Sequence, residues 1–427
     1  MAGNLICADA ESHRHVSAPC DLQLPTMPSS RTEELVALLD NIQVYDCEDD
    51  SNGHGDRVAV VEATRRLLAR LETPFERAWH LSWINSNVHA AIQVIMDVGI
   101  WEGWRLSKRR EISLSELHAL ARIPCDLMLL RRLFRLLAAE NVVRELGEDR
   151  YGTTAFSEAL GQPSEPVAQT ILSGTHHGLD SSRNLPQFLA QTAYEEPLDP
   201  KNSSYMDLTP ERLGMFERCR ANPEYQTSFI GFMRGLAAYK LDWTEIYDTK
   251  ILMSDFDTNG ELPLFVDVGG AHGVDIERLL NKYPDLPSGK LILQDTPDVI
   301  AMAKVNDKIS VQAHDFFTPQ PVKGARAYFM HAILHDWDDA DATRILNQTA
   351  VAMKKGYSKL LLYESVLVSV GATLYQSNAD VSLMHLISAA ERTEARWREL
   401  LRVAGFEVLK IWQHPASLES IIEAELI

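Results

Sequence analysis

Cysteine is scarce in this sequence. The chain has five cysteines in 427 residues, and no two of them form a CxxC motif. Such spacing supports neither a disulfide framework nor a zinc knuckle. We therefore expect free thiols at Cys7, Cys20, Cys47, Cys125 and Cys219.

Long apolar runs are also missing. No window reaches the ~18 uncharged residues of a membrane-spanning helix. The N-terminus lacks the basic-then-apolar pattern of a secretory signal. These two features lead us to expect a cytoplasmic protein with no membrane partner.

Positive charge is in deficit. The chain has 41 Lys and Arg against 60 Asp and Glu, which gives a formal net charge of -19. A field of this sign repels nucleic acids and anionic membranes. A small molecule is the more consistent partner.

The length exceeds what one hydrophobic core usually supports, so several domains are expected. Residues 1–30 are rich in Ser, Pro and His and read as a flexible arm, followed by a short helix from Thr32 to Gln43. We expect a helical region over 31–165, a helical linker and substrate-pocket region over 166–250, and an α/β domain over 251–427.

The segment from Ile112 to Thr154 has a winged-helix layout. Ser113 and Glu116 form a capping box before a first helix, and a second helix runs to Ala139. Two short strands then flank the turn at Gly147 to Asp149. DNA binding is one interpretation of this layout, because the second helix carries Arg131, Arg132 and Arg135. In so acidic a chain, a solvated face or a subunit contact fits these arginines better.

The last domain shows βαβ alternation. A mostly parallel, doubly wound sheet covered by helices on both faces is the fold predicted by this pattern. Its expected strands are 264–268, 290–295, 309–313, 325–330 and 359–364, and its main expected helices end at Tyr283, Val305 and Lys354.

The first of these strands runs into a glycine-rich turn, "VDVGGAHGVDI". Gly269, Gly270 and Gly273 would let backbone amides approach a ligand, with a helix N-terminus behind them. A dinucleotide fingerprint needs glycine where Ala271 and Val274 stand, and no Gly-Lys-Ser/Thr follows as in a P-loop. A ligand without a pyrophosphate is therefore favoured.

Acidic residues lie near the ends of three successive strands. They are Asp267, Asp295, which is placed to take ribose hydroxyls, and Asp315, which could accept from an adenine amine with Phe316 against the ring. Each alone could be a solvated loop carboxylate. Together with the glycine turn they predict a nucleoside-type cofactor.

Three further sequence blocks follow the glycine turn: "HAILHDWDDADATRIL", "LLLYESVL" and "AAERTEARWRELLRVAGFEV". With them the chain resembles S-adenosylmethionine-dependent O-methyltransferases of the caffeate and fungal secondary-metabolite type, over roughly Trp83 to Val408. The resemblance implies a Rossmann-like catalytic domain behind a winged-helix dimerisation domain. It also implies a homodimer, S-adenosylmethionine as cofactor with S-adenosylhomocysteine as product, and no metal.

By the same resemblance His335 is the catalytic base, with Glu364 and Glu391 flanking its ring. An imidazole is suited to take the proton of a phenol, whose pKa of ~10 makes it a poor nucleophile at neutral pH. Alternatively, His335 has only a structural role, as a packed or capping residue beside the helix that starts near Asp338. His331 and His335 at i, i+4 could suggest a metal, but no third ligand at suitable spacing appears.

The resemblance further assigns Gly269, Asp295, Asp315 and Phe316 to the cofactor, with Trp337 behind the adenosine. The expected substrate wall contains Met233, His177, Leu383 and Leu386. Apolar residues at helical spacing are also common in plain core. The chain departs from the family pattern at Ala271, which could crowd the turn, in "QDTPDVI", and at His331, where plant members often carry lysine.

Two rival activities stay open. Some methyltransferase-like fungal proteins bind the cofactor but catalyse dehydration or pericyclic rearrangement, with the sulfonium as an electrostatic catalyst. In those, the histidine of HDW is replaced, so His335 favours methyl transfer, although the pair His176–His177 could reach a substrate. The other rival is a catalytically silent scaffold, which should have lost the base or a glutamate. The acceptor is expected to be a hydroxyl on a small aromatic, polyketide-type or alkaloid-type metabolite.

Overall fold

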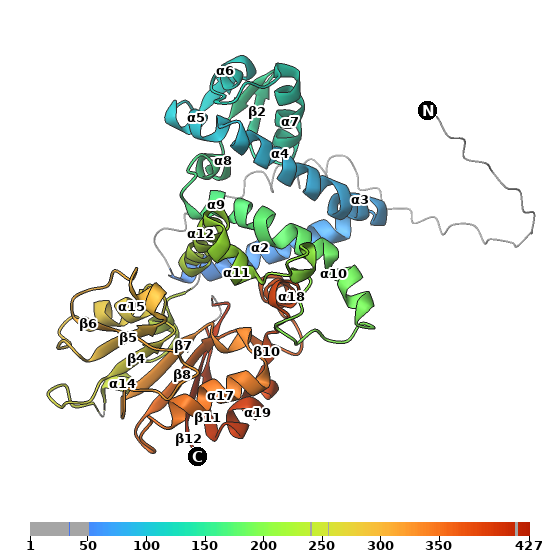
Figure 1. The fold of residues 1–427 in the computed structure, drawn as a ribbon. Coiled ribbons are helices and arrows are strands. Elements are labelled where there is room, and N and C mark those ends of the chain that lie inside the picture. The colour runs from blue at the N-terminus through green and yellow to red at the C-terminus, as the bar shows by residue number, and fades with distance from the viewer. Residues whose placement is uncertain (1–33, 35–50, 240, 255, 415–416) are drawn as a thin grey trace, which may run out of the picture. The chain divides into compact units, whose positions relative to one another are not determined.

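The structure is a computed structural model that describes residue 34 and residues 51–239, 241–254, 256–414 and 417–427 (Figure 1). The chain divides into two units, Met1–Arg57 and Val58–Ile427. The arm expected over 1–30 and, apart from Glu34, the helix expected from Thr32 to Gln43 lie outside the described residues. Cys125 and Cys219 are free thiols, as expected.

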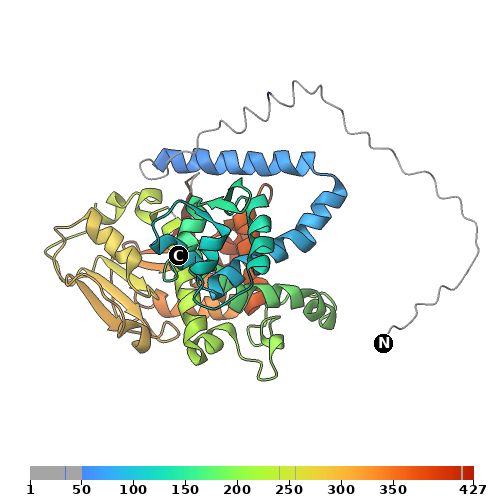
Figure 2. The ribbon, with the colours of Figure 1, turned by 90° about the horizontal axis from the view of Figure 1, so that it is seen from above.

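The first described helices follow one another along the chain with short breaks. Figure 2 shows α2 as one unbroken helix, and Thr73 caps α3 with a capping box to Glu76. A π-turn, η1, then joins α3 to α4. The elements are α2 (Ser51–Leu71), α3 (Pro74–Trp79), η1 (His80–Ile84), α4 (Asn85–Asp97) and α5 (Ile100–Leu106).

The winged-helix layout is present. The capping box at Ser113 is formed, since its backbone N–H donates to Glu116 at 2.9 Å. Arg131 donates to Asp149 of the hairpin turn at 2.9 Å, so this arginine is paired inside its own domain. The elements are β1 (Glu111–Ser113), α6 (Leu114–Ala119), α7 (Leu127–Ala139), β2 (Arg144–Gly147), β3 (Arg150–Gly152) and α8 (Ala155–Leu160), with strand order β1-β3-β2.

The region that follows is helical and carries a second π-turn. That turn, η2, contains the "THHG" stretch and interrupts two helices that would otherwise be one. π-turns of this kind often occur at functional sites. The elements are α9 (Pro166–Ser173), η2 (Gly174–Gly178), α10 (Leu179–Gln191), η3 (Met206–Leu208), α11 (Met215–Ala221) and α12 (Pro223–Tyr239).

A seven-stranded sheet forms the last part of the chain. Its order is β11-β12-β8-β7-β4-β5-β6, parallel from β6 to β8, with an antiparallel hairpin at the other edge. The predicted fold class is confirmed. The strands are β4 (Phe265–Val268), β5 (Leu291–Asp295), β6 (Ile309–Ala313), β7 (Ala327–His331), β8 (Lys359–Glu364), β11 (Phe406–Trp412) and β12 (Ser420–Leu426), and a separate parallel pair joins β9 (Val366–Leu367) to β10 (Arg392–Thr393).

Helices cover both faces of this sheet (Figure 1). Alternate residues of the central strands face opposite ways, as the strand period of two requires: Val266 packs with α17 and α19, and Phe265 packs with α13 and α15. The helices are α13 (Trp243–Ile246), α14 (Lys250–Met253), α15 (Val274–Lys282), α16 (Pro297–Ile300), η4 (Leu334–Asp336), α17 (Asp339–Ala350), α18 (Leu374–Ile387) and α19 (Glu394–Val403).

The strand order reverses between β4 and β7, because the chain continues from β4 toward β6 and then returns to β7 on the other side. Ligands of open parallel sheets bind at such a point, beyond the carboxyl ends of the strands. The glycine turn and the HDW block both begin there. Among the described helices, none is long and apolar enough to cross a membrane; the cytoplasmic location stays a prediction.

Candidate active site

The glycine turn is closely packed. Gly269 has φ +74, and a Cβ on it would lie 2.7 Å from Cδ1 of Ile333. A Cβ on Gly270 would lie 2.4 Å from the carboxyl carbon of Asp267. Real Cβ atoms do not approach so closely, so these two positions require glycine. The turn is thereby pressed against both the β4 acid and the segment that leads to His335.

Asp267 is a buried acid without a matching donor. It is 1% exposed, and neither of its oxygens accepts a hydrogen bond of normal geometry from the described residues. Burial and the nearby Asp275 raise its pKa well above the usual value, and His331 and the Ile276 amide offset only part of this. An acceptor left unsatisfied beside a glycine turn suits a ligand that brings donors or positive charge.

The other two acids end neighbouring strands. Asp295 accepts the backbone N–H of Ala271 at 2.9 Å and that of Thr296 at 2.7 Å, so it is joined to the glycine turn. Asp315 accepts from Phe317 at 2.9 Å and is exposed. Because β4, β5 and β6 are adjacent and parallel, their acids lie along one edge of the sheet, as the spacing predicted.

An aromatic wall stands at the same edge. The rings of Phe316 and Trp337 meet edge to face with centroids 6.1 Å apart, and Phe317 approaches Trp337 to 4.8 Å. A Cβ on Gly269 would lie 3.8 Å from Phe316. A glycine cradle, acids and an aromatic wall together fit a flat nucleoside with polar edges.

His335 lies in a ring of carboxylates. Its Nδ1 is 3.3 Å from Oε1 of Glu391 and 3.7 Å from Oε2 of Glu364, and its Nε2 is 3.5 Å from Asp336. The imidazole side chain is 17% exposed, whereas the Glu364 and Glu391 side chains are 0% and 4% exposed. The three residues taken from separate sequence blocks thus meet at one point.

The protonation of this cluster follows from its charges. Burial opposes a charge on His335, but Glu364, Asp336 and Glu391 outweigh it and raise the pKa of the imidazole to about 10. Burial raises the pKa of Glu364 to about 7 despite the opposing effect of His335. The surrounding carboxylates therefore favour the protonated form of His335.

The sequence did not point to Arg392 or Asp380, and it singled out His331 only as a possible metal ligand and as a departure from the family pattern. Arg392 donates to the carbonyls of Leu334 and Trp337, both at 2.6 Å, and so fixes the turn that carries His335. Asp380 accepts the backbone N–H of Glu391 at 2.8 Å. His331 contacts Asp275 at 2.6 Å. Arg392 directly follows Glu391 in the ERTE block, which was the available signal for it.

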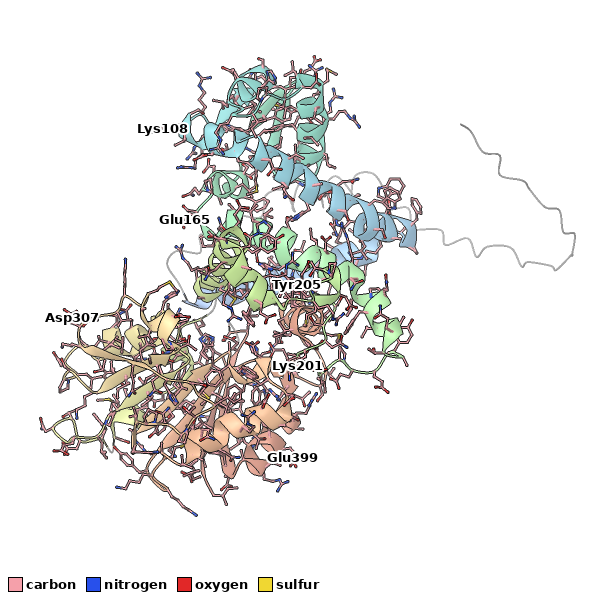
Figure 3. The ribbon with its side chains drawn as sticks, viewed as in Figure 1. Lys108, Glu165, Lys201, Tyr205, Asp307 and Glu399 are labelled. Carbon is pink, nitrogen blue, oxygen red and sulfur yellow. The ribbon has the colours of Figure 1, made fainter. Side chains whose placement is uncertain are left out.

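His176 and His177 differ in their surroundings. His177 is 3% exposed. Its Nε2 lies 3.2 Å from the Tyr225 carbonyl and its Nδ1 lies 2.9 Å from the hydroxyl of Tyr205, which is labelled in Figure 3. His176 stacks on Tyr225 and lies 2.8 Å from the Ser228 hydroxyl, which donates to the Tyr225 carbonyl. From this network we assign the proton of His176 to Nδ1 and a lone pair to Nε2.

The remaining expected wall residues lie on two helices. Met233, on α12, is 39% exposed. Leu383 and Leu386 are half-buried on α18, which His385 ties to α10 through Ser181 at 2.8 Å. Among the described residues, no cluster of three or more His, Cys, Asp or Glu is arranged to hold a metal ion.

Comparisons with known proteins give a consistent result. Residues 213–407 match the family model of an O-methyltransferase domain. The chain is 42% identical to O-methyltransferase ATR12 of Stachybotrys chlorohalonatus, over 93% of this chain and 100% of that protein. It is 34% identical to O-methyltransferase mfmE of Annulohypoxylon moriforme, over 93% of this chain and 96% of that protein.

Solved structures are similar over most of the chain. A structure titled as a pericyclic reaction enzyme and one of LepI in complex with SAM each have a TM-score of 0.79 and 26% identity, covering 93% of this chain and 100% of theirs. OxaC has a TM-score of 0.75 and 24% identity, covering 93% and 98%, which shows a shared fold.

Proposed function

Since the chain belongs to the S-adenosylmethionine-dependent O-methyltransferases of fungal secondary metabolism, we propose that it methylates a hydroxyl of a small metabolite, with His335 as general base. The observation that carries this proposal is the position of His335. The imidazole is held by buried Glu391 and Glu364 at the carboxyl edge of the sheet, next to the glycine turn.

The residues of the switch point would hold the cofactor. Asp267, Gly269, Gly270 and Gly273 form the cradle, Asp295 and Asp315 offer acceptors, and Phe316 and Trp337 offer ring faces. The unsatisfied buried carboxyl of Asp267 and the absence of room for side chains at Gly269 and Gly270 support this placement. When bound, S-adenosylmethionine supplies an electrophilic methyl group on a sulfonium.

The chemistry of the chain itself is proton transfer and positioning. In its neutral form, His335 takes the proton of the acceptor hydroxyl at Nε2, and its Nδ1–H stays directed at Glu391. The buried carboxylates stabilise the imidazolium that results, as a carboxylate does for the histidine of a catalytic triad. Arg392 keeps the turn at Leu334 and Trp337 in place, so that the nitrogen and the hydroxyl meet in one geometry.

The acceptor in this proposal is an aromatic or enolic hydroxyl on a polyketide-type or alkaloid-type scaffold. Met233, Leu383 and Leu386 would form an apolar wall for such a ring system. The buried and fully engaged nitrogens of His177 support an indirect role, in which it shapes the wall from behind Tyr205 and Tyr225.

A second candidate function is rearrangement or dehydration without methyl transfer. Two features favour it: the similarity to a pericyclic reaction enzyme at 26% identity, and the carboxylates around His335, which raise its pKa to about 10 and favour the imidazolium. A protonated imidazole can act as an acid or stabilise developing negative charge. His176, with an unprotonated Nε2, would be the base in such a reaction.

A homodimer through the N-terminal helices is part of the proposal. Leu71, Phe75, Trp79 and Trp83 recur every four residues and are 50 to 69% exposed. Exposed apolar stripes of this size usually mark contact surfaces. A second copy of the chain is the partner that the family resemblance implies.

The decisive experiment uses methyl-labelled S-adenosylmethionine and an extract of the source organism. Methyl transfer gives a labelled product that is lost in His335→Ala, with a rate decrease of at least about 10²-fold. His118→Gln serves as control, because His118 lies on α6 of the winged-helix region, where its Nε2 is 2.7 Å from the Cys125 carbonyl. Conversion of an extract component without label transfer supports rearrangement instead.

A further inference from the structure

A buried ion network lies on the opposite face of the sheet from Glu364. His331 is the last residue of β7, and its Nδ1 is 2.6 Å from Oδ2 of Asp275 in the first turn of α15. Its Nε2 is 3.1 Å from Oε2 of Glu419, just before β12. The side chains of His331, Asp275 and Glu419 are 17%, 12% and 8% exposed. One imidazole thus joins three elements of the domain.

The network is cationic at its centre. Burial opposes the charge, but Glu419 and Asp275 raise the pKa of His331 to about 9. Arg278 takes the other oxygen of Asp275 at 3.0 Å and also faces Asp242 at 3.6 Å. Breaking one link of such a buried set leaves a charge unpaired, which costs more than the loss of an exposed ion pair.

This network lies beside both the glycine turn and the segment that leads to His335. Helix α15 begins directly after Gly273, so Asp275 determines how the glycine turn enters the helix. After His331 the chain turns through Ala332, which has φ +51. The next residue, Ile333, packs against Gly269. The segment from His331 to His335 is therefore held to α15 at one end and to Glu364 at the other, through the amides of Ile333 and Leu334.

We propose that His331 is a positioning residue, which ties α15 to β7 and so sets the distance between the glycine turn and the segment that carries His335. The inference rests on the proposed placement of the cofactor at that turn. It gives His331 a role through Asp275 rather than through contact with the cofactor. A lysine could fill the same role, because a long ammonium can also pair with two carboxylates.

The test measures S-adenosylhomocysteine binding by isothermal titration calorimetry, which needs no turnover. His331→Gln should weaken binding about tenfold, since a neutral amide leaves one buried carboxylate unpaired. His331→Lys should stay within about threefold of the parent chain because it restores the cation. His118→Gln should bind like the parent.

Asp275→Asn provides a second variant in case His331→Gln does not fold. It removes the same link from the α15 side and should weaken binding to a similar degree, and the double variant should be no weaker than either single one. Thermal unfolding of each ligand-free variant separates loss of fold from loss of affinity. Equal affinity in the parent and His331→Gln would overturn the proposal, and so would a His331→Lys protein as weak as His331→Gln. Failure of the parent itself to bind would instead overturn the cofactor placement.

Discussion

In the proposed catalytic cluster, Nδ1 of His335 lies 3.3 Å from Oε1 of Glu391. Glu364 faces the same nitrogen from 3.7 Å. One N–H can be directed at only one of these carboxylates. Glu364 also accepts the amides of Ile333 and Leu334 through its other oxygen. The two glutamates therefore have different tasks: Glu391 orients the ring, and Glu364 fixes the turn.

Glu391→Gln should separate these tasks. The amide keeps an acceptor for Nδ1–H but loses the charge that stabilises the imidazolium, which should lower kcat by about 10²-fold. Removal of one negative charge should also shift the midpoint of the kcat–pH profile to lower pH, since that charge helps to raise the pKa of His335. Glu364→Ala should in addition lose about 1–3 kcal/mol of stability because two buried amides lose their acceptor. Initial rates from pH 6 to 10 measure the pH midpoint, and urea unfolding measures the stability loss. An unchanged pH midpoint in Glu391→Gln would contradict the role of Glu391 beside His335.

Cofactor binding should be linked to proton release. The neighbouring carboxylates raise the pKa of His335 to about 10 and so favour its protonated form at neutral pH, whereas a second positive charge bound nearby disfavours the imidazolium. Binding of S-adenosylmethionine should therefore release up to about one proton, whereas the uncharged sulfur of S-adenosylhomocysteine should release less. Calorimetry at pH 8 in buffers with different ionisation enthalpies measures the number. His335→Gln should remove the difference between the two ligands, and equal proton release in the parent chain would argue against the linkage.

Stability of the ligand-free chain should fall as pH rises. The folded pKa values of His331 and His335, about 9 and about 10, exceed the ordinary histidine value of 6.5. Their contribution is fully present below pH 6.5 and is lost as pH rises through 9 to 10. The pKa of Glu364 is raised from 4.5 to about 7, so this residue also lowers the stability as pH rises, over a lower pH range. Urea unfolding at pH 6, 8 and 10 should show this decline, and His335→Gln should make it shallower; a rise in stability over this range would refute the charge assignment.

The sequence predicted the elements whose causes are local. The capping box at Ser113, the glycine turn after β4 and the parallel strands all depend on short-range patterns, and the structure contains them. His335, Glu364 and Glu391 could be grouped only through the family resemblance, because nothing local links residues 27 to 56 positions apart.

Other features depend on contacts that no local pattern encodes. The expected helix to Val305 ends at Ile300, and the helix to Lys354 ends at Ala350. Helical spacing continues in the sequence, but the structure has turns after Ile300 and after Ala350, and helix ends fray by about one or two residues, or more without a strong cap. The link between His331 and Asp275 spans 56 positions, so its two ends look like ordinary polar residues until the sheet brings them together.

The glycine turn allows a matched pair of variants. Gly270→Ala places a Cβ 2.4 Å from the carboxyl carbon of Asp267 and 2.6 Å from Leu293, so it should cost about 1–3 kcal/mol and weaken cofactor binding. Ala271→Gly changes a residue that already has φ +49. Relief of strain and gain of unfolded-state entropy oppose each other there, so its effect should stay within about 1 kcal/mol. Thermal unfolding and S-adenosylhomocysteine titration distinguish them, and equal effects of the two changes would show that the turn is not closely packed.

The apolar stripe on the N-terminal helices makes a prediction about assembly. Phe75 and Trp79 have ring centroids 5.6 Å apart, and Trp79 and Trp83 stack at 6.3 Å, so the rings form one continuous surface. A groove of about 390 Å³ beside them is lined by Leu68, Leu71 and Ile84 among others. Charges on this surface should prevent burial against a second copy, because an unpaired buried carboxylate is costly. Light scattering after size exclusion should give twice the chain mass of 48.0 kDa for the parent and the single mass for Trp79→Asp/Trp83→Asp.

The control for this surface is Val370→Asp. Val370 is 91% exposed but lies in the loop after β9, outside the stripe, so the charge there should leave the dimer intact. A parent chain that elutes as a monomer at micromolar concentration would refute the dimer. A double aspartate variant that stays dimeric would show that the contact uses another surface. Retention of S-adenosylhomocysteine binding by the monomeric variant would show that the cofactor site is complete within one chain, as expected from the position of all its residues between Asp267 and Trp337.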